Sequence, residues 1–169
     1  MTYAIVYSSR TGNTRMLADT LHTTLPAGSC LYFGEPAAEA LNADRLYVGF
    51  WTDKGTCDAD TAAFLKQIRG KEVFLFGTAG FGADPAYYDR ILTNVRKHLD
   101  SSVTVLGGYM CQGKMPMSVR DRYEAMLKAP VHMPNLPAMI ENFDKALTHP
   151  DAADLQALAA AVHKEETNV

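Results

Sequence analysis

A buried strand, a polar loop and the start of a helix follow one another in YAIVYSSRTGNT, residues 3–14. Residues 3–7 are apolar without alternation, which indicates a strand that is covered on both faces. Residues 13–25 then carry apolar side chains at helical spacing. A strand followed by a helix predicts a parallel α/β sheet, because parallel strands need a crossover connection.

The same alternation of strand and helix continues along most of the chain. Further strands are expected at residues 30–33, 45–50, 73–76 and 103–109, and further helices at 60–68, 86–98 and 151–162. Asp58 or Asp60 is a candidate N-cap for the helix at 60–68, and residues 35–44 leave room only for a short helix. These elements predict a three-layer α/β sandwich with a five-stranded parallel sheet.

Composition and charge exclude several classes of protein. The length of 169 residues suits one domain, residues 1–169, and 47% hydrophobic with 21% charged residues indicates a globular chain. A net charge of −3 leaves no surplus of basic residues for sequence-independent binding of nucleic acid, and no apolar run reaches the length of a membrane span. No secretory signal is expected. Cys30, Cys57 and Cys111 fit neither a disulfide framework nor a zinc site, which predicts a cytoplasmic protein.

The segment 110–149 interrupts this pattern, because a short loop would suffice before the last helix. We expect a helix near 118–127, a turn broken by Pro130, Pro134 and Pro137, and a second helix near 139–147. Six of the eight methionines lie between Met110 and Met139. They either fill irregular gaps in an added subdomain or form an adaptable docking surface, and the sequence favours neither reading.

The loop after the first strand has the features of an anion site. Ligands of open α/β sheets bind beyond the carboxyl ends of the strands. Hydroxyl side chains surround one glycine here, and the free amides and the dipole of the following helix favour a phosphate. A helix N-cap alone needs only one such residue. The predicted phosphate-binding residues are Ser8, Ser9, Arg10, Thr11, Gly12, Asn13 and Thr14; Arg10 either points outward or meets the phosphate.

Two further loops place aromatic side chains beside glycines. Trp51 follows the third strand, and Phe81 stands between glycines after the fourth. Such a pair suits a flat aromatic ligand held between two side chains. Phe50 could instead close the edge of the sheet, whereas the other two are expected in turns. The predicted ligand-binding residues of these loops are Phe50, Trp51, Thr52, Asp53, Lys54, Gly55, Thr78, Ala79, Gly80, Phe81 and Gly82.

These motifs resemble those of the flavodoxins and flavodoxin-like FMN proteins, over about residues 1–110 and 148–165. Residues 8–14 match the phosphate loop of the family, and the loops at Trp51 and at residues 77–82 match its two isoalloxazine-binding loops. The stretch before the last helix, His149, Pro150 and Asp151, also resembles the sequence found there in the family. The resemblance implies the strand order 2-1-3-4-5, FMN as the cofactor, and a helical insertion at about 110–149 near the flavin edge.

The resemblance also implies how the flavin is controlled. Trp51 and Phe81 would enclose the ring, and a peptide within residues 52–55 would reorient when flavin N5 gains a proton. Gly55, or the peptide between Asp53 and Lys54, is the candidate, since positive φ costs glycine little. An apolar, stacked site disfavours added negative charge, which predicts a strongly reducing cofactor.

By resemblance, the protein is an electron carrier whose partners are an electron-donating reductase and an acceptor enzyme. The alternative is an FMN-dependent NAD(P)H oxidoreductase of quinones or other small acceptors, with the insertion above the substrate. A phosphoacceptor signalling domain would need acids where Ser8 and Ser9 stand. The mild net charge departs from the strongly acidic character of many flavodoxins and weakens the case for electrostatically steered docking.

Other motifs carry no chemistry that the sequence supports. Residues 108–114 fit G-x-x-x-x-G-K, but Met115 stands where a nucleotide P-loop needs Ser or Thr. The histidines show no metal-ligand or triad spacing, and Cys57 and Cys111 are expected to be packing residues. No metal site and no catalytic residue is predicted. Tyr109, Cys111 and Gln112 are candidates to border the flavin.

Overall fold

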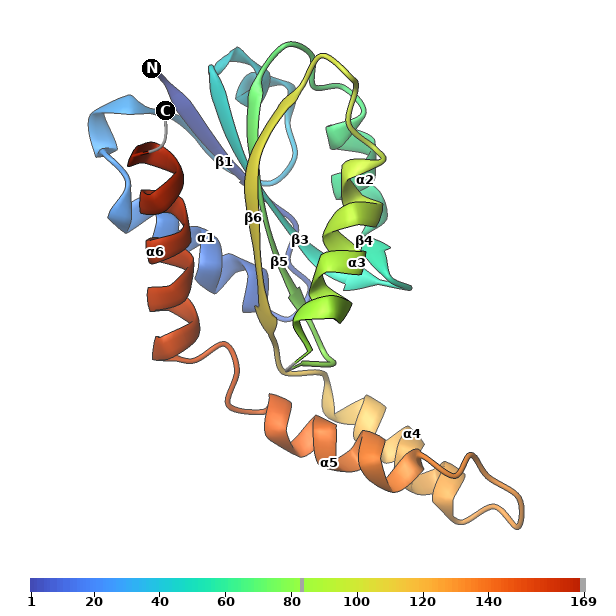
Figure 1. Ribbon diagram of the computed structural model, residues 1–169. Coiled ribbons are helices and arrows are strands. Elements are labelled where there is room, and N and C mark those ends of the chain that lie inside the picture. The colour runs from blue at the N-terminus through green and yellow to red at the C-terminus, as the bar shows by residue number, and fades with distance from the viewer. Residues whose placement is uncertain (83, 168–169) are drawn as a thin grey trace.

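The computed structural model describes residues 1–82 and 84–167 and has a twisted sheet between two layers of helices (Figure 1). In the described residues, the parallel strands run in the order β2-β1-β3-β5-β6. They are β1 (Tyr3–Tyr7), β2 (Cys30–Gly34), β3 (Arg45–Asp53), β5 (Glu72–Ala79) and β6 (Thr104–Gln112). The predicted fold and strand order are confirmed. A short β4 (Thr56–Cys57) pairs antiparallel with β3 and extends the sheet beyond the prediction.

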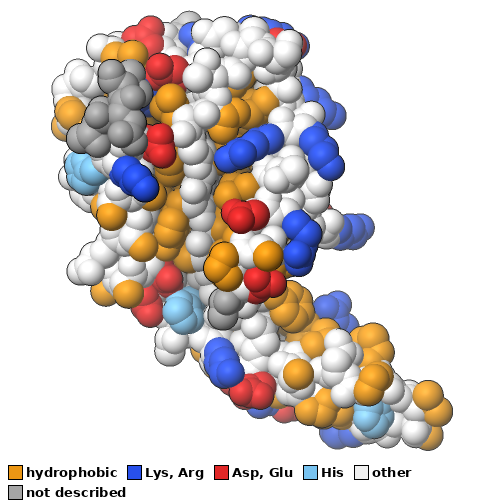
Figure 2. Space-filling view, in the orientation of Figure 1, with side chains coloured by type: hydrophobic (Ala, Val, Ile, Leu, Met, Phe, Trp, Pro, Cys, Tyr) orange, Lys and Arg blue, Asp and Glu red, His pale blue; other side chains and the backbone are white. Residues whose placement is uncertain are grey.

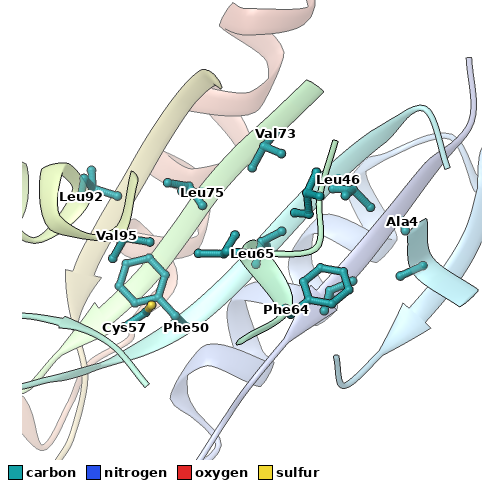
Figure 3. Close-up of a cluster of buried hydrophobic side chains, with 14 of the residues drawn as sticks. Ala4, Leu46, Phe50, Cys57, Phe64, Leu65, Val73, Leu75, Leu92 and Val95 are labelled. Carbon is teal, nitrogen blue, oxygen red and sulfur yellow. The ribbon is translucent and has the colours of Figure 1, made fainter. Parts of the chain in front are cut away.

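Helices α1 (Asn13–Thr24) and α6 (Ala152–Thr167) cover one face of the sheet, and α2 (Ala59–Leu65) and α3 (Pro85–Arg96) cover the other. The side chains of β3 alternate between two apolar clusters. Leu46 and Phe50 face α2 and α3, where Figure 3 shows them, and Tyr47 faces α1 and α6. The strands therefore read as continuous apolar runs because both faces are buried.

The remaining connections are short. Two 3₁₀ turns, η1 (Ala27–Ser29) and η2 (Ala38–Asn42), flank β2, so residues 35–44 hold only a short helix, as predicted. Asp58 is the N-cap of α2, because its carboxylate accepts a hydrogen bond of 3.1 Å from the Thr61 amide.

Three strands continue beyond their predicted ends. Trp51 pairs with Thr78, and Ala79 pairs with Gln112, so the ladder of hydrogen bonds runs past the apolar cores of β3, β5 and β6. The expectation that Trp51 lies in a turn was wrong for this reason. The side chains predicted in loops therefore stand partly at the ends of rigid strands.

A helical arm, residues 113–149, projects from the carboxyl end of the sheet (Figure 1). It contains α4 (Met117–Leu127) and α5 (Leu136–Ala146). Strand β6 continues to Gln112, so the arm begins a few residues after the predicted start of the insertion at about residue 110. Helix α5 begins before its predicted start, since Pro137 occupies its first turn, where proline is tolerated.

Contacts within the arm and at its base fix its position. The guanidinium Nε of Arg120 on α4 donates to the Asp144 carboxylate on α5 at 2.9 Å. At the base, His149 Nδ1 lies 2.6 Å from an Asp154 carboxylate oxygen at the start of α6. The Lys114 amide donates to the His149 carbonyl at 2.9 Å, which joins the two ends of the arm.

The methionines between residues 110 and 149 differ in burial. Met110 is buried, and Met115 packs against Gly80. Met117 and Met133 are exposed, and Figure 2 shows hydrophobic side chains along the arm. Among the described residues, no helix has the length and apolar character that a membrane span requires.

Candidate functional site

A cavity of about 320 Å³ lies between the carboxyl ends of the central strands and the arm. We name it the arm cavity. The chain moves from β1 outward to β2 and then back past β1 to β3, and ligands of open α/β sheets bind where the strand order reverses in this way. Its walls come from the loop before α1, the ends of β3 and β5, and the arm. Predicted site residues on these walls are Arg10, Thr11, Asn13, Thr14, Trp51, Thr52, Thr78, Ala79 and Gly80.

The start of α1 presents backbone amides, and its N-cap residue supplies no side-chain cap. Gly12 is the N-cap residue, with a φ of 89° that favours glycine. Ser9 Oγ accepts a hydrogen bond of 3.3 Å from the Arg15 amide. The amides of Asn13 and Thr14 have no acceptor within the helix, because helix geometry leaves the first turn unpaired. These donors and the helix dipole favour an anion at this point.

Thr14 holds this loop against the sheet. Its side chain is buried, and Oγ1 donates a hydrogen bond of 3.1 Å to the Phe50 carbonyl. The same hydroxyl lies 3.2 Å from Thr78 Oγ1. Three segments that are distant in sequence therefore meet at Thr14, and its hydroxyl positions the loop.

Two polar atoms at the cavity are buried without a partner in the described residues: Asn13 Oδ1 and Thr52 Oγ1. Asn13 is only 6% exposed, and its Nδ2 donates to the Lys114 carbonyl at 2.9 Å. A buried acceptor without a hydrogen bond costs about 1–3 kcal/mol. A hydrogen-bonding group that reached either atom would remove this cost.

Trp51 and Arg10 separate the arm cavity from a second one. The Arg10 guanidinium carbon lies 5.6 Å from the centroid of the Trp51 ring, within cation–π range. Both residues also line a cavity of about 530 Å³ beside η2 and α2, which we name the α2 cavity. Ser8 and Ser9 line the α2 cavity, so the predicted phosphate loop borders both spaces.

The loop after β5 is held by β6 and by the arm. The Gly80 carbonyl accepts hydrogen bonds of 3.0 Å from the side-chain amides of Gln112 and Asn142. A Cβ at Gly80 would lie 2.5 Å from Met115 Sδ, so a side chain at this position would displace Met115. Gln112 therefore borders the loop that the family resemblance assigned to the flavin.

Three predicted residues lie away from the arm cavity, at the turn between β3 and β4. Asp53 pairs with Thr56, and Lys54 and Gly55 form a two-residue turn with φ values of 50° and 81°. The Gly55 carbonyl accepts a hydrogen bond of 3.0 Å from the Asn94 side-chain amide. Helix α3 thus holds this turn beside itself, and none of the three predicted residues lines either cavity.

The two phenylalanines predicted at the ring also lie outside the arm cavity. Phe50 is fully buried, and a Cβ at Gly77 would lie 2.5 Å from its ring, so Phe50 closes the sheet instead. Phe81 is 41% exposed. A Cβ at Gly82 would lie 2.5 Å from the Gln112 side chain, which places that glycine beside β6. Of the predicted aromatic side chains, the tryptophan is the one on the cavity wall.

Tyr109 and Cys111 do not border the site. The Tyr109 hydroxyl donates to the Asp154 carbonyl at 2.8 Å, and Cys111 is buried against α1 and α6. Burial raises the pKa of both groups, and it raises the pKa of the Cys57 thiol to about 11. Both thiols therefore stay protonated near neutral pH, as packing residues do.

The arm supplies wall residues that the sequence did not assign to the ligand site. They are Gly113, Lys114, Met115, Pro116, Ser118, Val119 and Arg122. The insertion follows β6, which ends beside the site, so its place in the sequence indicated that the arm would lie near the cavity. The individual residues depend on how the arm folds back, which no local sequence pattern specifies.

The flavodoxin domain family matches residues 4–163. The flavodoxin-like domain-containing protein BilS of Clostridium symbiosum (strain WAL-14163) is 46% identical, over 93% of this chain and 92% of that protein. The protein of the same name from Clostridioides difficile (strain CD3) is 27% identical, over 89% and 88%. The resemblance drawn from the motifs is confirmed.

Solved structures agree on the fold. The flavodoxin of Streptococcus pneumoniae TIGR4 has a TM-score of 0.57 at 15% identity, over the full length of both chains. Oxidised flavodoxin 2 of Bacillus cereus has a TM-score of 0.56 at 16% identity, again over both full chains. A flavoprotein of Lactobacillus acidophilus NCFM in complex with FMN has a TM-score of 0.51 at 14% identity, covering 73% of this chain and 98% of that one.

Proposed function

Because the chain belongs to the flavodoxin family, we propose that it binds FMN in the arm cavity and carries electrons between partner proteins. The flavoprotein of Lactobacillus acidophilus, which shares this fold, is described in complex with FMN. The proposed partners are an electron-donating reductase and an acceptor enzyme. When bound, FMN would supply one-electron redox chemistry, which protein side chains do not provide.

The residues at the cavity fit the three parts of FMN. The Asn13 and Thr14 amides and the Thr11 hydroxyl would hold the phosphate at the start of α1. The unpaired Asn13 Oδ1 and Thr52 Oγ1 would bond the hydroxyls of the ribityl chain. Trp51 would contact the flat ring. The observation that carries the proposal is the buried, unpartnered Asn13 acceptor beside the unpaired amides at the start of α1.

The size of the arm cavity supports a carrier. A volume of about 320 Å³ is at the lower end of the range of about 300–1,000 Å³ for small-molecule sites. FMN would fill it, with little room for a second reactant. Within the described residues, no His, Asp or Glu lines its wall to move a proton to a substrate.

The α2 cavity favours a second candidate function. This space of about 530 Å³ shares the Trp51 wall and would accept a small molecule beside the ring. The chain would then be an FMN-dependent NAD(P)H oxidoreductase of quinones or other small acceptors. Reduction by NAD(P)H without any partner protein, followed by turnover of a quinone, would decide for this activity.

The proposed carrier works in the cytoplasm. Cys30, Cys57 and Cys111 are free thiols in the structure. Thiols persist where the compartment is reducing, and disulfides are rare there.

A redox titration of the FMN-loaded protein tests the carrier proposal. A carrier accepts its two electrons in separate steps, so two resolved one-electron potentials are expected. The loaded protein should also pass electrons to cytochrome c and should react slowly with NAD(P)H alone. A single two-electron transition together with rapid oxidation of NAD(P)H would contradict it.

A further inference from the structure

Positive charge is concentrated at the arm cavity. Among the described residues, its wall carries Arg10, Lys114 and Arg122 and no Asp or Glu. The chain as a whole has a net charge of −3, and the α2 cavity holds Glu35 and Asp60. The excess of positive charge is therefore specific to the arm cavity and is not found over the whole chain.

The three cations have no carboxylate partner within 4.0 Å in the described residues. Neighbouring charges do pair: Arg120 contacts Asp144, and Lys145 contacts Glu141. The backbone at Lys114 is nevertheless fixed, because its carbonyl accepts from Asn13 and its amide donates to His149. The structure thus holds unpaired positive charge at the cavity wall.

The cations come from two different segments. Arg10 belongs to the loop before α1, where the phosphate would lie, and it contacts Trp51. Lys114 and Arg122 belong to the arm and line the same cavity, and the Lys114 carbonyl accepts a hydrogen bond from Asn13. Amides and hydroxyls at the start of α1 could hold the phosphate without either arm cation.

We propose that Lys114 and Arg122 bind reduced FMN more tightly than oxidised FMN and thereby raise its reduction potential. The inference rests on the proposed binding of FMN in this cavity. In each step one electron enters from the donor protein, and where a proton follows, it comes from solvent and forms an N–H bond on the ring. An added electron makes the ring more negative unless a proton follows, and nearby cations favour the more negative state. The cations would therefore raise the reduction potential, whereas an apolar site alone was expected to lower it.

The ratio of the dissociation constants for oxidised and reduced FMN determines how far binding shifts the reduction potential of the flavin. Binding fully reduced FMN tenfold more tightly than oxidised FMN raises the two-electron potential by about 30 mV, because the thermodynamic cycle must close. A cation that serves only the phosphate strengthens both redox states equally and leaves the potential unchanged. The ratio of the two dissociation constants therefore isolates contacts with the ring.

The test compares the wild type with the double variant Lys114→Gln, Arg122→Gln. Dissociation constants for oxidised FMN, and for FMN reduced anaerobically with dithionite, are measured at low and high salt. We expect the reduced form to bind about tenfold more weakly in the variant, with a smaller change for the oxidised form. The difference should shrink at high salt, because the cations are exposed. Lys128→Gln, at the end of α4 and outside the cavity wall, is the matched control.

Three results would overturn the inference. Equal weakening of both redox states would assign the cations to the phosphate, and unchanged constants would place them away from the flavin. An equal effect of Lys128→Gln would show a general charge effect. The proposed function fails separately, if the wild type binds neither form of FMN.

Discussion

Trp51 stands between two cavities, and its ring is the aromatic surface of the proposed flavin site. Replacement by alanine removes the stacking surface and joins the two spaces. We expect Trp51→Ala to weaken FMN binding about tenfold or more, since aromatic contacts contribute about 0.5–1.5 kcal/mol beyond buried area. Trp51→Phe should retain most of the affinity. Calorimetry measures both, and unchanged affinity in the alanine variant would remove Trp51 from the site.

Gly12 is the residue whose backbone shapes the start of α1. Its φ of 89° disfavours any residue with a Cβ, although no atom lies within 4 Å of where that Cβ would be. Gly12→Ala should therefore lower the free energy of unfolding by about 1–2 kcal/mol through conformation alone. Gly28→Ala is the matched control, because that site is equally open and its φ is not in the left-handed region. Urea unfolding distinguishes them, and equal effects would refute the backbone argument.

At the level of elements, the arm holds the loop after β5. Asn142 and Gln112 both donate to the Gly80 carbonyl. Asn142→Ala removes one of these bonds, worth about 1 kcal/mol. We expect FMN to dissociate about fivefold faster and the Gly80 loop to exchange amide hydrogens faster. Glu141→Ala, one residue away and exposed, should change neither rate. Wild-type rates for Asn142→Ala would show that the loop needs no support from α5.

The contact between α4 and α5 depends on pH. The Arg120 guanidinium hydrogen-bonds to Asp144 and lowers the pKa of that carboxyl. A lowered pKa means that the contact stabilises the arm above the ordinary pKa of an aspartate and is lost as pH falls through the lowered value. NMR titration of the Asp144 carboxyl carbon should show this pKa, and Arg120→Met should raise it toward the ordinary value. An unchanged pKa in the variant would contradict the assignment.

At the scale of the whole molecule, the sequence predicts the order and type of the main elements. Apolar runs such as residues 3–7 and 73–76 identify strands because both faces of the sheet are buried. The ends of β3, β5 and β6 could not be predicted, because hydrogen bonding between neighbours such as Trp51 and Thr78 continues beyond the apolar residues.

Some residues of the candidate site could also be predicted from the sequence, and others could not. Residues 8–14 could be recognised because hydroxyls, a glycine and a helix start are adjacent in sequence. Phe50 and Lys54 lie off the wall of the arm cavity, whereas Lys114 and Arg122 line it, and this depends on where side chains and the arm lie in space. The local sequence does not predict the distances between these segments.

The most direct test of the account is calorimetric titration of the purified chain with FMN and, separately, with riboflavin. The account predicts one site for FMN and an affinity at least about a hundredfold lower for riboflavin, because only FMN places an anion at the start of α1. The absence of FMN binding, or equal affinity for the two compounds, would contradict it.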